Sequence, residues 1–140
     1  MKTKQAGFTL IEIMVVVVII ALMLAAIAPR VFNRLEQAQE TRATQDIRAI
    51  ESALKFYRLD NFVYPSQSQG LEALVTEPTG ARAWRGPYLD RLPLDPWNNA
   101  PYRYRIPSDH GLDYDVFTYG ADDAEGGEGQ DADLGNWTIQ

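Results

Sequence analysis

Carboxylates at two places in the sequence could bind charged partners. Glu12 is the one charged residue in the apolar stretch 8–29, and six further acids lie between Gly120 and Gly135. Because a carboxylate is costly to place inside an apolar span, we expect Glu12 either to reach the polar end of its helix or to meet a positive charge from a neighbouring chain. The six acids of the later segment are Asp122, Asp123, Glu125, Glu128, Asp131 and Asp133.

The acidic segment also contains five glycines and no lysine or arginine. One interpretation is a flexible, solvated loop, since like charges repel and glycine is costly to order. The other is a site for Ca²⁺, which takes oxygen ligands from carboxylates and from backbone carbonyls. Residues 131–135 lack the third ligand and the closing glutamate of an EF-hand loop. Mg²⁺ tolerates irregular geometry poorly, and Zn²⁺ is disfavoured because the chain has no cysteine and one histidine.

No catalytic constellation occurs in the sequence. His110, beside Gly111, is typical of a surface turn, and there is no Ser/His/Asp set, P-loop or HExxH motif. The three tryptophans are expected to lie in the core rather than to line a groove. We therefore predict that the protein is not an enzyme.

The net charge of −6 on the 140 residues is unevenly distributed. Residues 106–140 hold nine acids and no lysine or arginine, which leaves a net charge of +3 on residues 1–105. A globally acidic chain without a basic patch of interleaved aromatics argues against nucleic-acid binding.

The apolar stretch 8–29 is long enough to cross a membrane. Its 22 residues would span about 33 Å as a helix, against a hydrocarbon core of about 30 Å. A cleaved secretory signal is the alternative, but its apolar region is usually about 7–15 residues long and no clear A-x-A site follows here. Lys2 and Lys4 precede the stretch, so we expect a cytoplasmic N-terminus and an exported remainder.

The helical pattern continues beyond Pro29, which we expect to kink it. One apolar face recurs at steps of four, three, four and three residues, as in an amphipathic helix. We therefore predict one helix over residues 8–59, apolar over 8–29 and amphipathic over 30–60. The residues of the apolar face are Ala43, Ile47, Ile50, Leu54 and Tyr57.

Residues 61–140 predict a small head rich in turns. Residues 70–76 predict a short helix, and residues 102–106 and 114–119 predict antiparallel strands joined by a turn at 108–111. Residues 136–139 predict a third strand. About eighty residues with few Leu and Ile form a thin core, so we expect the head to pack against the amphipathic half of the helix. The predicted fold class is α+β.

The run Gly7-Phe8-Thr9-Leu10-Ile11-Glu12, with basic residues before it and an apolar run after it, resembles the N-terminus of type IV pilin-like prepilins. The resemblance implies that a prepilin peptidase removes residues 1–7, leaving 133 of the 140 residues, and methylates the new N-terminal Phe8. It also implies a partner for Glu12, the Phe8 amine of an adjacent subunit. Opposite charges that both leave water offset each other only in good geometry, so this pair would set the register between neighbouring helices.

Motifs along the head are similar, in order, to those of the G-type major pseudopilins of type II secretion systems. They are Gln69-Gly70-Leu71-Glu72-Ala73-Leu74, Gly86-Pro87-Tyr88-Leu89, Leu94-Asp95-Pro96-Trp97-Asn98, Pro101-Tyr102-Arg103-Tyr104, Gly120-Ala121-Asp122 and Ala132-Asp133-Leu134-Gly135-Asn136-Trp137. The resemblance implies a type IV pilin-like fold. It also implies the role of major structural subunit of a pseudopilus, a periplasmic fibre that helps to drive folded exoproteins across the outer membrane.

The same resemblance implies partners and a location. The partners are further copies of the chain, minor pseudopilins, the prepilin peptidase and the assembly platform of the inner membrane. The chain would cross the inner membrane once and hold its head, residues 61–140, in the periplasm.

In the family that the chain resembles, a structural Ca²⁺ occupies the acidic loop, here residues 119–135. Matching the motifs implies as ligands the carboxylates of Asp122 and Asp133 and the carbonyl of Tyr119, with Asp131 as a further candidate. Where relatives can have a hydroxyl residue, this chain has Gly135, which would offer only a carbonyl or leave the place to water. Two other functions stay open, a type IV pilin for adhesion or motility and a membrane-anchored, exported calcium-binding module.

Overall fold

The computed structural model describes residues 7–139, apart from the side chains of residues 28–30 and 32. The chain divides into two compact units, residues 1–37 and residues 38–140, here called the N-terminal unit and the head unit. The first six residues of the predicted leader lie outside the described part of the chain.

One long helix, α1, runs from Leu10 to Asn61 and contributes to both units. It confirms the helix predicted over residues 8–59, with a difference of two residues at each end. The backbone is helical through Pro29.

The head unit folds around one face of α1. Ala43, Ile47, Ile50, Leu54 and Tyr57 are each at most 2% exposed, which confirms the apolar face predicted from their spacing. The same core contains side chains of the sheet and of the segment before it, including Leu71, Leu74, Tyr102, Tyr104 and Val116.

A three-stranded antiparallel sheet packs in the head unit, in the order β1-β2-β3. Its strands are β1 (Arg103–Arg105), β2 (Asp115–Thr118) and β3 (Leu134–Gly135). In the central strand, Phe117 pairs with Arg103 on one side and with Gly135 on the other. All four residues of β2 are buried, so both faces of this strand are covered. The prediction of an α+β fold is confirmed.

The position predicted for the third strand, residues 136–139, is wrong. Residues 136–138 form a turn, in which the Thr138 amide donates a hydrogen bond to the Gly135 carbonyl at 2.9 Å. The reason lies in Asn136, whose side chain accepts from the Val116 amide and donates to the Tyr114 carbonyl, both at 3.0 Å. The Asn136 amide still donates to the Val116 carbonyl at 3.1 Å, but its side chain rather than a main-chain carbonyl satisfies the Val116 amide, so the main chain can turn away after this residue.

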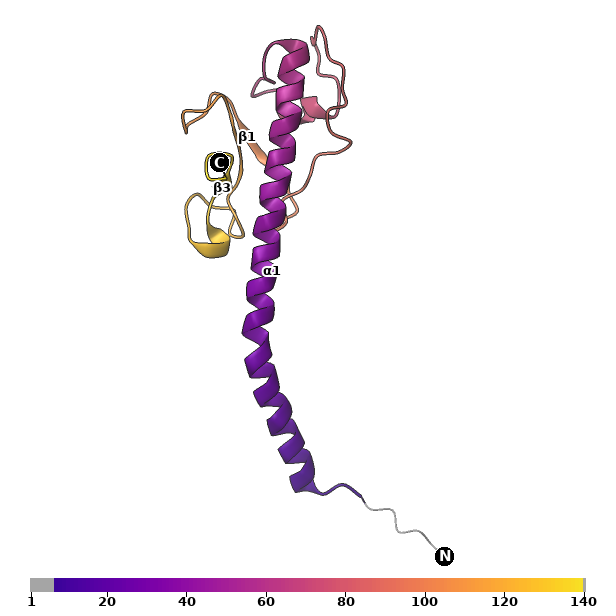
Figure 1. Ribbon diagram of the computed structural model, residues 1–140, viewed down its shortest axis with the longest axis vertical. Helices are drawn as coiled ribbons and strands as arrows, with labels where there is room; N and C mark the ends of the chain where they lie inside the picture. The colour runs from indigo at the N-terminus through magenta and orange to yellow at the C-terminus, as the bar shows by residue number, and fades with distance from the viewer. Residues whose placement is uncertain (1–6, 140) are drawn as a thin grey trace, which may run out of the picture. The chain divides into compact units, whose positions relative to one another are not determined.

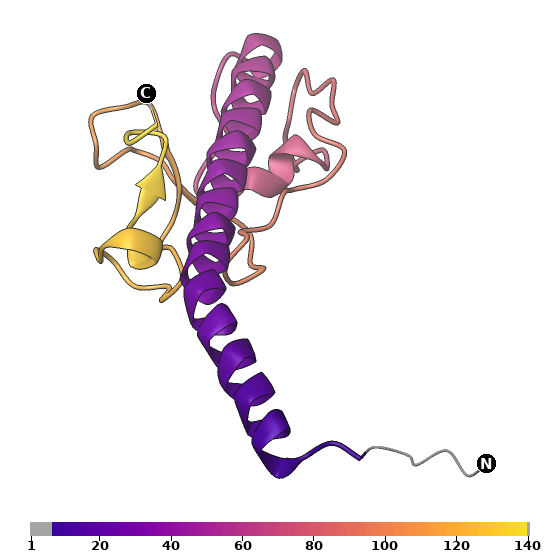
Figure 2. The same ribbon diagram turned by 60° about the horizontal axis from the view of Figure 1, so that its bottom comes forward.

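The helix predicted over residues 70–76 is a single 3₁₀ turn, η1, from Leu71 to Leu74. It ends early because the Leu74 carbonyl accepts hydrogen bonds from the amides of Tyr88, at 2.7 Å, and Leu89, at 3.2 Å, instead of from a following helical turn. In two views of the head unit, α1 lies between the sheet and η1 (Figures 1 and 2). The sheet and η1 therefore flank the helix, whose opposite face stays exposed.

The three tryptophans differ in their surroundings. Trp84 and Trp97 are partly buried against the core, as predicted, and the Trp84 indole donates to the Ala73 carbonyl at 2.9 Å. Trp137 instead stacks on His110, with ring centroids 3.6 Å apart and planes at 7°.

The helix α1 ends in a residue with a left-handed backbone. Phe62 follows Asn61, has a φ of 64°, and donates its amide to the Arg58 carbonyl at 2.8 Å. Helices often end in this conformation, but glycine usually adopts it, because a Cβ atom there costs about 1–2 kcal/mol. The Phe62 side chain is 84% exposed, so its burial does not offset that cost.

Candidate functional site

The residues around the predicted cleavage position lie at the start of α1. The carbonyl and the hydroxyl of Thr9 accept hydrogen bonds from the Glu12 amide, at 3.1 and 3.3 Å, so Thr9 is the N-cap of the helix. Thr9 is absent from the predicted site residues, although its three-residue spacing from Glu12 is the sequence signal of a capping box. A carboxylate in the first helical turn is also favoured by the partial positive charge of the helix N-terminus. Glu12 therefore stabilises the start of α1 even in a single subunit, without a positive charge from a neighbouring chain.

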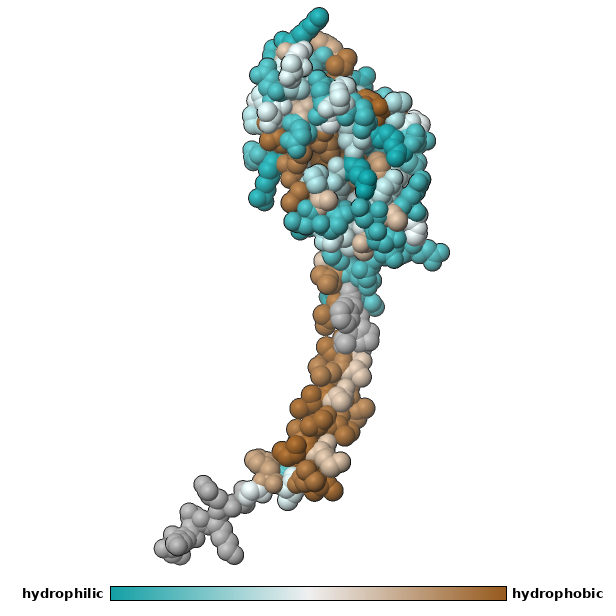
Figure 3. Space-filling model, turned by 180° about the vertical axis from the view of Figure 1, so that it is seen from behind, coloured by the Kyte–Doolittle hydropathy of each residue, from teal (hydrophilic) through white to brown (hydrophobic). Residues whose placement is uncertain are grey.

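The N-terminal unit exposes its apolar side chains. The stretch Leu10–Ile27 has a mean hydropathy of 3.1 and no buried residue, and Figure 3 shows its apolar surface. Its length and composition are sufficient for a membrane span, by those two criteria alone. Within residues 7–139, no cation pairs with Glu12.

The acidic loop, residues 119–135, is closed at its base. The Ala121 amide donates to the Gln130 carbonyl at 2.9 Å, and Thr118 pairs with Leu134 where β2 meets β3. These contacts bring the segment that starts at Tyr119 beside the segment that ends at Asp133. The loop therefore gathers oxygen atoms from both of its ends.

Two glycines permit this close approach. Gly120 has a φ of 72°, and a Cβ atom there would lie 2.5 Å from the Gln130 carbonyl oxygen. A Cβ atom on Gly127, whose φ is 87°, would lie 2.4 Å from the Asp131 carbonyl oxygen. Any side chain at either position would force the backbone apart.

Asp133 has an unsatisfied carboxylate oxygen. Its Oδ2 accepts from the Gly126 amide at 3.0 Å, whereas its Oδ1 is buried and has no hydrogen-bond partner among the described residues. A buried polar atom without a partner costs free energy, and a cation would satisfy it. This observation fits the predicted role of Asp133 as a metal ligand.

The other predicted ligands have different surroundings. The Asp122 Oδ1 accepts from the Ala124 amide at 3.1 Å, which leaves Oδ2 without a local bond in this turn. Asp131 is exposed and ends the 3₁₀ helix η2, which spans Gly129–Asp131. Tyr119 connects β2 to the loop, and Arg103 lies over its ring at 4.6 Å from the centroid.

Acidic side chains alone do not assemble a metal site in the described part of the chain. Among residues 7–139, no three or more His, Cys, Asp or Glu side chains form a group that could hold a metal ion. Asp123 pairs with Arg103 at 2.9 Å, and Glu125 and Glu128 are exposed without an ion pair to any described residue. A metal in this loop would therefore need carbonyl oxygens beside two carboxylates.

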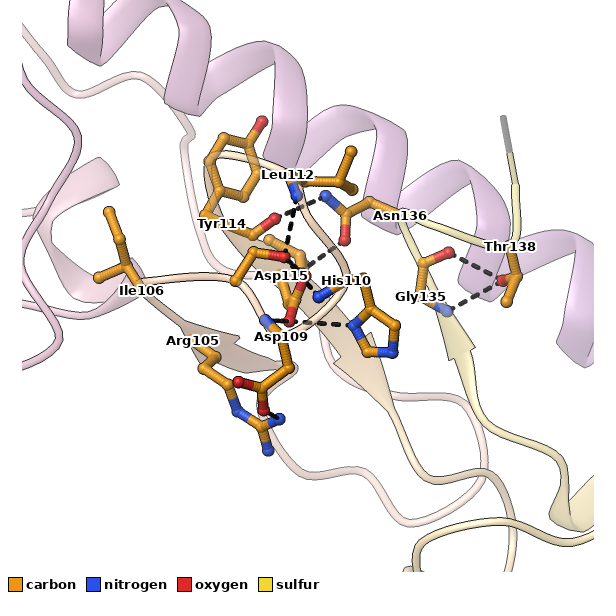
Figure 4. A network of polar contacts seen from close by, with 12 residues as sticks. Arg105, Ile106, Asp109, His110, Leu112, Tyr114, Asp115, Gly135, Asn136 and Thr138 are labelled. Carbon is orange, nitrogen blue, oxygen red and sulfur yellow. Dashed lines mark hydrogen bonds and ion pairs between the residues drawn. The ribbon is translucent and has the colours of Figure 1, made fainter.

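A buried carboxylate that was not among the predicted site residues fixes the turn before β2. Asp115 is 0% exposed and accepts hydrogen bonds from the Ser108 hydroxyl, from the Asp109 amide at 2.9 Å and from His110 Nδ1 at 3.1 Å (Figure 4). Burial raises the pKa of the Asp115 carboxyl, but these hydrogen bonds outweigh burial and hold that pKa below its ordinary value. His110 is partly exposed, as expected of a turn residue, yet it also anchors this network.

Ser108, His110 and Asp115 have the residue types of a hydrolytic triad without its geometry. Ser108 and His110 both bond to Asp115, and the Ser108 hydroxyl accepts from the amides of His110 and Leu112. In a triad the serine would face the imidazole nitrogen that is distal to the carboxylate. The network therefore supports the turn rather than a nucleophile.

Both halves of the chain match known families. Residues 30–137 match the family described as type II secretion system (T2SS), protein G, and residues 2–28 match the prokaryotic N-terminal methylation motif. The chain is 54% identical over 140 residues to the type II secretion system core protein G of Vibrio cholerae, with 98% of this chain and 94% of that protein covered. It is 52% identical to the protein of the same description from Pseudomonas aeruginosa, with 97% of each covered.

A solved structure also resembles the chain. It is the major pseudopilin from the type 2 secretion system of enterohaemorrhagic Escherichia coli, with a TM-score of 0.65 and 39% sequence identity. The similarity covers 76% of this chain and 93% of that one.

Proposed function

The chain belongs to the family of type II secretion system protein G and is a major pseudopilin, and we propose that its N-terminal unit first anchors it in the inner membrane and then joins copies into a periplasmic fibre. The observation that carries this proposal is the exposed apolar helix, whose Glu12 forms no ion pair with a described side chain. Such a surface is stable only against lipid or against other apolar helices. The family match favours a pseudopilin over an adhesion or motility pilin.

Processing prepares the anchor for assembly. In this proposal the prepilin peptidase cleaves after Gly7 and methylates Phe8, which the match to the N-terminal methylation motif supports. The new Phe8 amine of one subunit then meets Glu12 of the next. Both charges leave water together, and their attraction offsets the cost of desolvation only in the correct axial register. A contact between two different surfaces that does not close on itself produces an open filament.

The fibre would act together with the other components of the secretion system. Minor pseudopilins and the assembly platform of the inner membrane would start and extend it, and its growth would help to move folded exoproteins across the outer membrane. The head unit, held in the periplasm, would form the outside of the fibre.

The assembly proposal is tested by replacing Glu12 in the full-length chain. Glu12→Leu removes the charge and keeps the segment apolar, so fibre yield should fall to background while the tryptophan fluorescence of the head unit is unchanged. Glu40→Leu, an exposed carboxylate on the same helix, is the matched control and should assemble normally. Fibres of Glu12→Leu at the wild-type yield would refute the register role.

We also propose that the acidic loop binds one structural Ca²⁺. The ligands would be the carboxylates of Asp122 and Asp133 and the carbonyls of Tyr119 and Asp131. The buried Asp133 Oδ1, which has no partner among the described residues, supports this assignment, as does the Asp131 carbonyl oxygen that Gly127 allows to approach. Ca²⁺ accepts irregular sets of carboxylate and carbonyl oxygens, and its charge would offset the repulsion within the loop.

The calcium proposal is tested by thermal unfolding of the full-length protein. Calcium at one hundred times its dissociation constant would add about 2.7 kcal/mol to the free energy of unfolding, and excess EGTA should remove this gain. Asp133→Asn should melt at the same temperature in calcium and in EGTA, whereas Glu128→Gln should respond like the wild type. Identical wild-type melting curves in millimolar calcium and in EGTA would sink the proposal.

A further inference from the structure

We propose that the head unit carries both halves of a second contact between copies, an apolar patch at the end of α1 and the acidic loop. The patch consists of Phe56, Leu59, Phe62 and Val63, with Lys55 at its edge. Its occupant is the segment 124–129 of a second copy. The inference rests on the proposed fibre and identifies the residues through which one head unit contacts the next.

The patch gathers the exposed large apolar side chains of the head unit, as far as its side chains are described. Phe56, Leu59, Phe62 and Val63 are 60%, 70%, 84% and 62% exposed. Leu59 and Phe62 line an open groove of about 510 Å³ together with Lys55, Arg58 and Tyr64. A concentrated apolar surface of this kind marks an interaction site more often than scattered exposed residues do.

Phe62 is unfavourable for the isolated head unit in two ways. Its Cβ atom occupies a left-handed backbone position that suits glycine, and its ring is exposed to water. Residues with a strained backbone cluster at ligand sites and at segments that switch conformation. The ring therefore has its use in contact with another molecule.

The size of the patch favours a copy that is already held nearby. Four such side chains expose roughly 500 Å² of apolar surface, less than the roughly 800 Å² per partner of a stable interface. Freely diffusing molecules would not stay bound through this area alone. Neighbouring subunits joined through α1 are at high effective concentration, so a small contact between their head units is sufficient.

Charge complementarity points to the acidic loop as the occupant. Lys55 is exposed and forms no ion pair with any described residue, and Glu125 and Glu128 are likewise exposed and unpaired within residues 7–139. Between these acids the loop offers bare backbone, because a Cβ atom on Gly126 would meet nothing within 4 Å. Bare backbone can lie flat on the Phe62 ring while the acids approach Lys55.

The two surfaces lie at opposite ends of the head unit. Asn98 contacts Asp123 at 3.4 Å, and Gln39 donates to the neighbouring Pro96 carbonyl at 3.1 Å, which places the acidic loop near residue 39 of α1. Phe62 lies 23 residues further along the helix, a rise of about 35 Å. Figures 1 and 2 show η2 at the end of the head unit away from the C-terminal end of α1. A contact from one end to the other repeats without closing, as a fibre requires.

Engineered cysteines test the contact directly, because the chain has none of its own. Full-length Phe62→Cys/Glu125→Cys, produced in cells with the secretion system and oxidised, should form a ladder of cross-linked oligomers. Arg82→Cys/Glu125→Cys, with the first cysteine in an exposed loop, is the control and should stay monomeric. Two outcomes would overturn the assignment. Dimers of Phe62→Cys alone would show that Phe62 contacts the same patch of another copy, and a ladder of Phe62→Cys/Val31→Cys in place of the expected one would show that Phe62 contacts the helix of another copy.

Charge reversal tests the same contact in the unmodified fibre. Lys55→Glu should lower fibre yield about fivefold, the change expected for one ion pair at the rim of an interface. Adding Glu125→Lys and Glu128→Lys to the Lys55→Glu chain should restore the yield. Fibres that form normally from Lys55→Glu, with no ladder from the cysteine pair, would refute this contact and leave the proposed fibre intact. A wild-type chain that forms no fibre, or a Glu12→Leu chain that does, would instead refute the proposed function.

Discussion

Replacing Phe62 by glycine should stabilise the head unit although it deletes a large apolar side chain. The Cβ atom at φ 64° costs about 1–2 kcal/mol, a cost that glycine avoids. Glycine in turn lowers the free energy of unfolding by about 0.5–1 kcal/mol, because it has greater entropy in the unfolded chain. The side chain is 84% exposed, so almost no burial is lost. The net expectation is a gain of about 0.5–1 kcal/mol, or a rise in melting temperature of about 4 °C for a unit of this size.

The assay is thermal unfolding of the full-length protein in detergent, followed by tryptophan fluorescence. All three tryptophans lie in the head unit, so the signal reports on that unit alone. Phe62→Ala is the matched control, because it removes the ring but keeps the Cβ atom, and it should show no gain. Phe62→Asn should fall between the two, since asparagine tolerates the left-handed region better than alanine does.

A glycine variant that is no more stable than the alanine variant would refute the reasoning, because the backbone of Phe62 would then carry no strain. The argument that the ring is kept for a partner would lose its support as well. Fibre assembly should respond in the opposite direction: Phe62→Gly should stabilise the head unit and yet lower the yield of assembled subunits.

Three further substitutions test other parts of the head unit. Leu54→Ala should cost about 3 kcal/mol in the same assay, because Leu54 is fully buried in the core. A loss below about 1 kcal/mol would contradict the packing described. The pKa of the Asp115 carboxyl is lowered in the folded state, so its charge stabilises the head unit above about pH 4, the ordinary pKa, and this stabilisation is lost as the pH falls through the folded-state pKa. Asp115→Asn should therefore be less stable than the wild type in urea at pH 7. A difference in stability that does not shrink towards pH 3 would refute this. Gly120→Ala should speed hydrogen exchange at the Ala121 amide, because its Cβ atom would lie 2.5 Å from the Gln130 carbonyl oxygen that this amide contacts, and unchanged exchange would count against a tight loop base.

The helix and its buried face could be predicted because they depend on local periodicity. A 4-3-4-3 spacing of apolar residues marks one side of a helix whatever packs against it, and Ile47, Ile50 and Leu54 are fully buried. The third strand was displaced because its register depends on Asn136, which bonds to residues 20 and 22 positions earlier in the chain. No local pattern in residues 134–139 carries that information.

The candidate site was predictable in the same uneven way. Gly7, Phe8 and Glu12 lie within the contiguous run 7–12, and Asp133 lies within the run 132–137, so the sequence could single them out, and their roles stay predictions. Asp115 was missed because its role depends on burial and on a turn that folds back over it. Phe62 was missed because its residue type gives no sign of a left-handed backbone, a position at which the sequence would suggest glycine or asparagine.

Residues 134–139 complete the head unit, although α1, around whose buried face this unit folds, is made first. β3 covers the open edge of β2, the side chain of Asn136 is buried beside it, and the Ile139 carbonyl accepts from Arg48 at 3.2 Å. A nascent chain with residues 134–140 still inside the ribosome should therefore be cut by protease in the head unit, and resistance of such a stalled chain would contradict this order. A chain that has not yet supplied residues 134–139 should therefore keep its head unit unfolded, which is the state that the proposed export through a narrow channel would require.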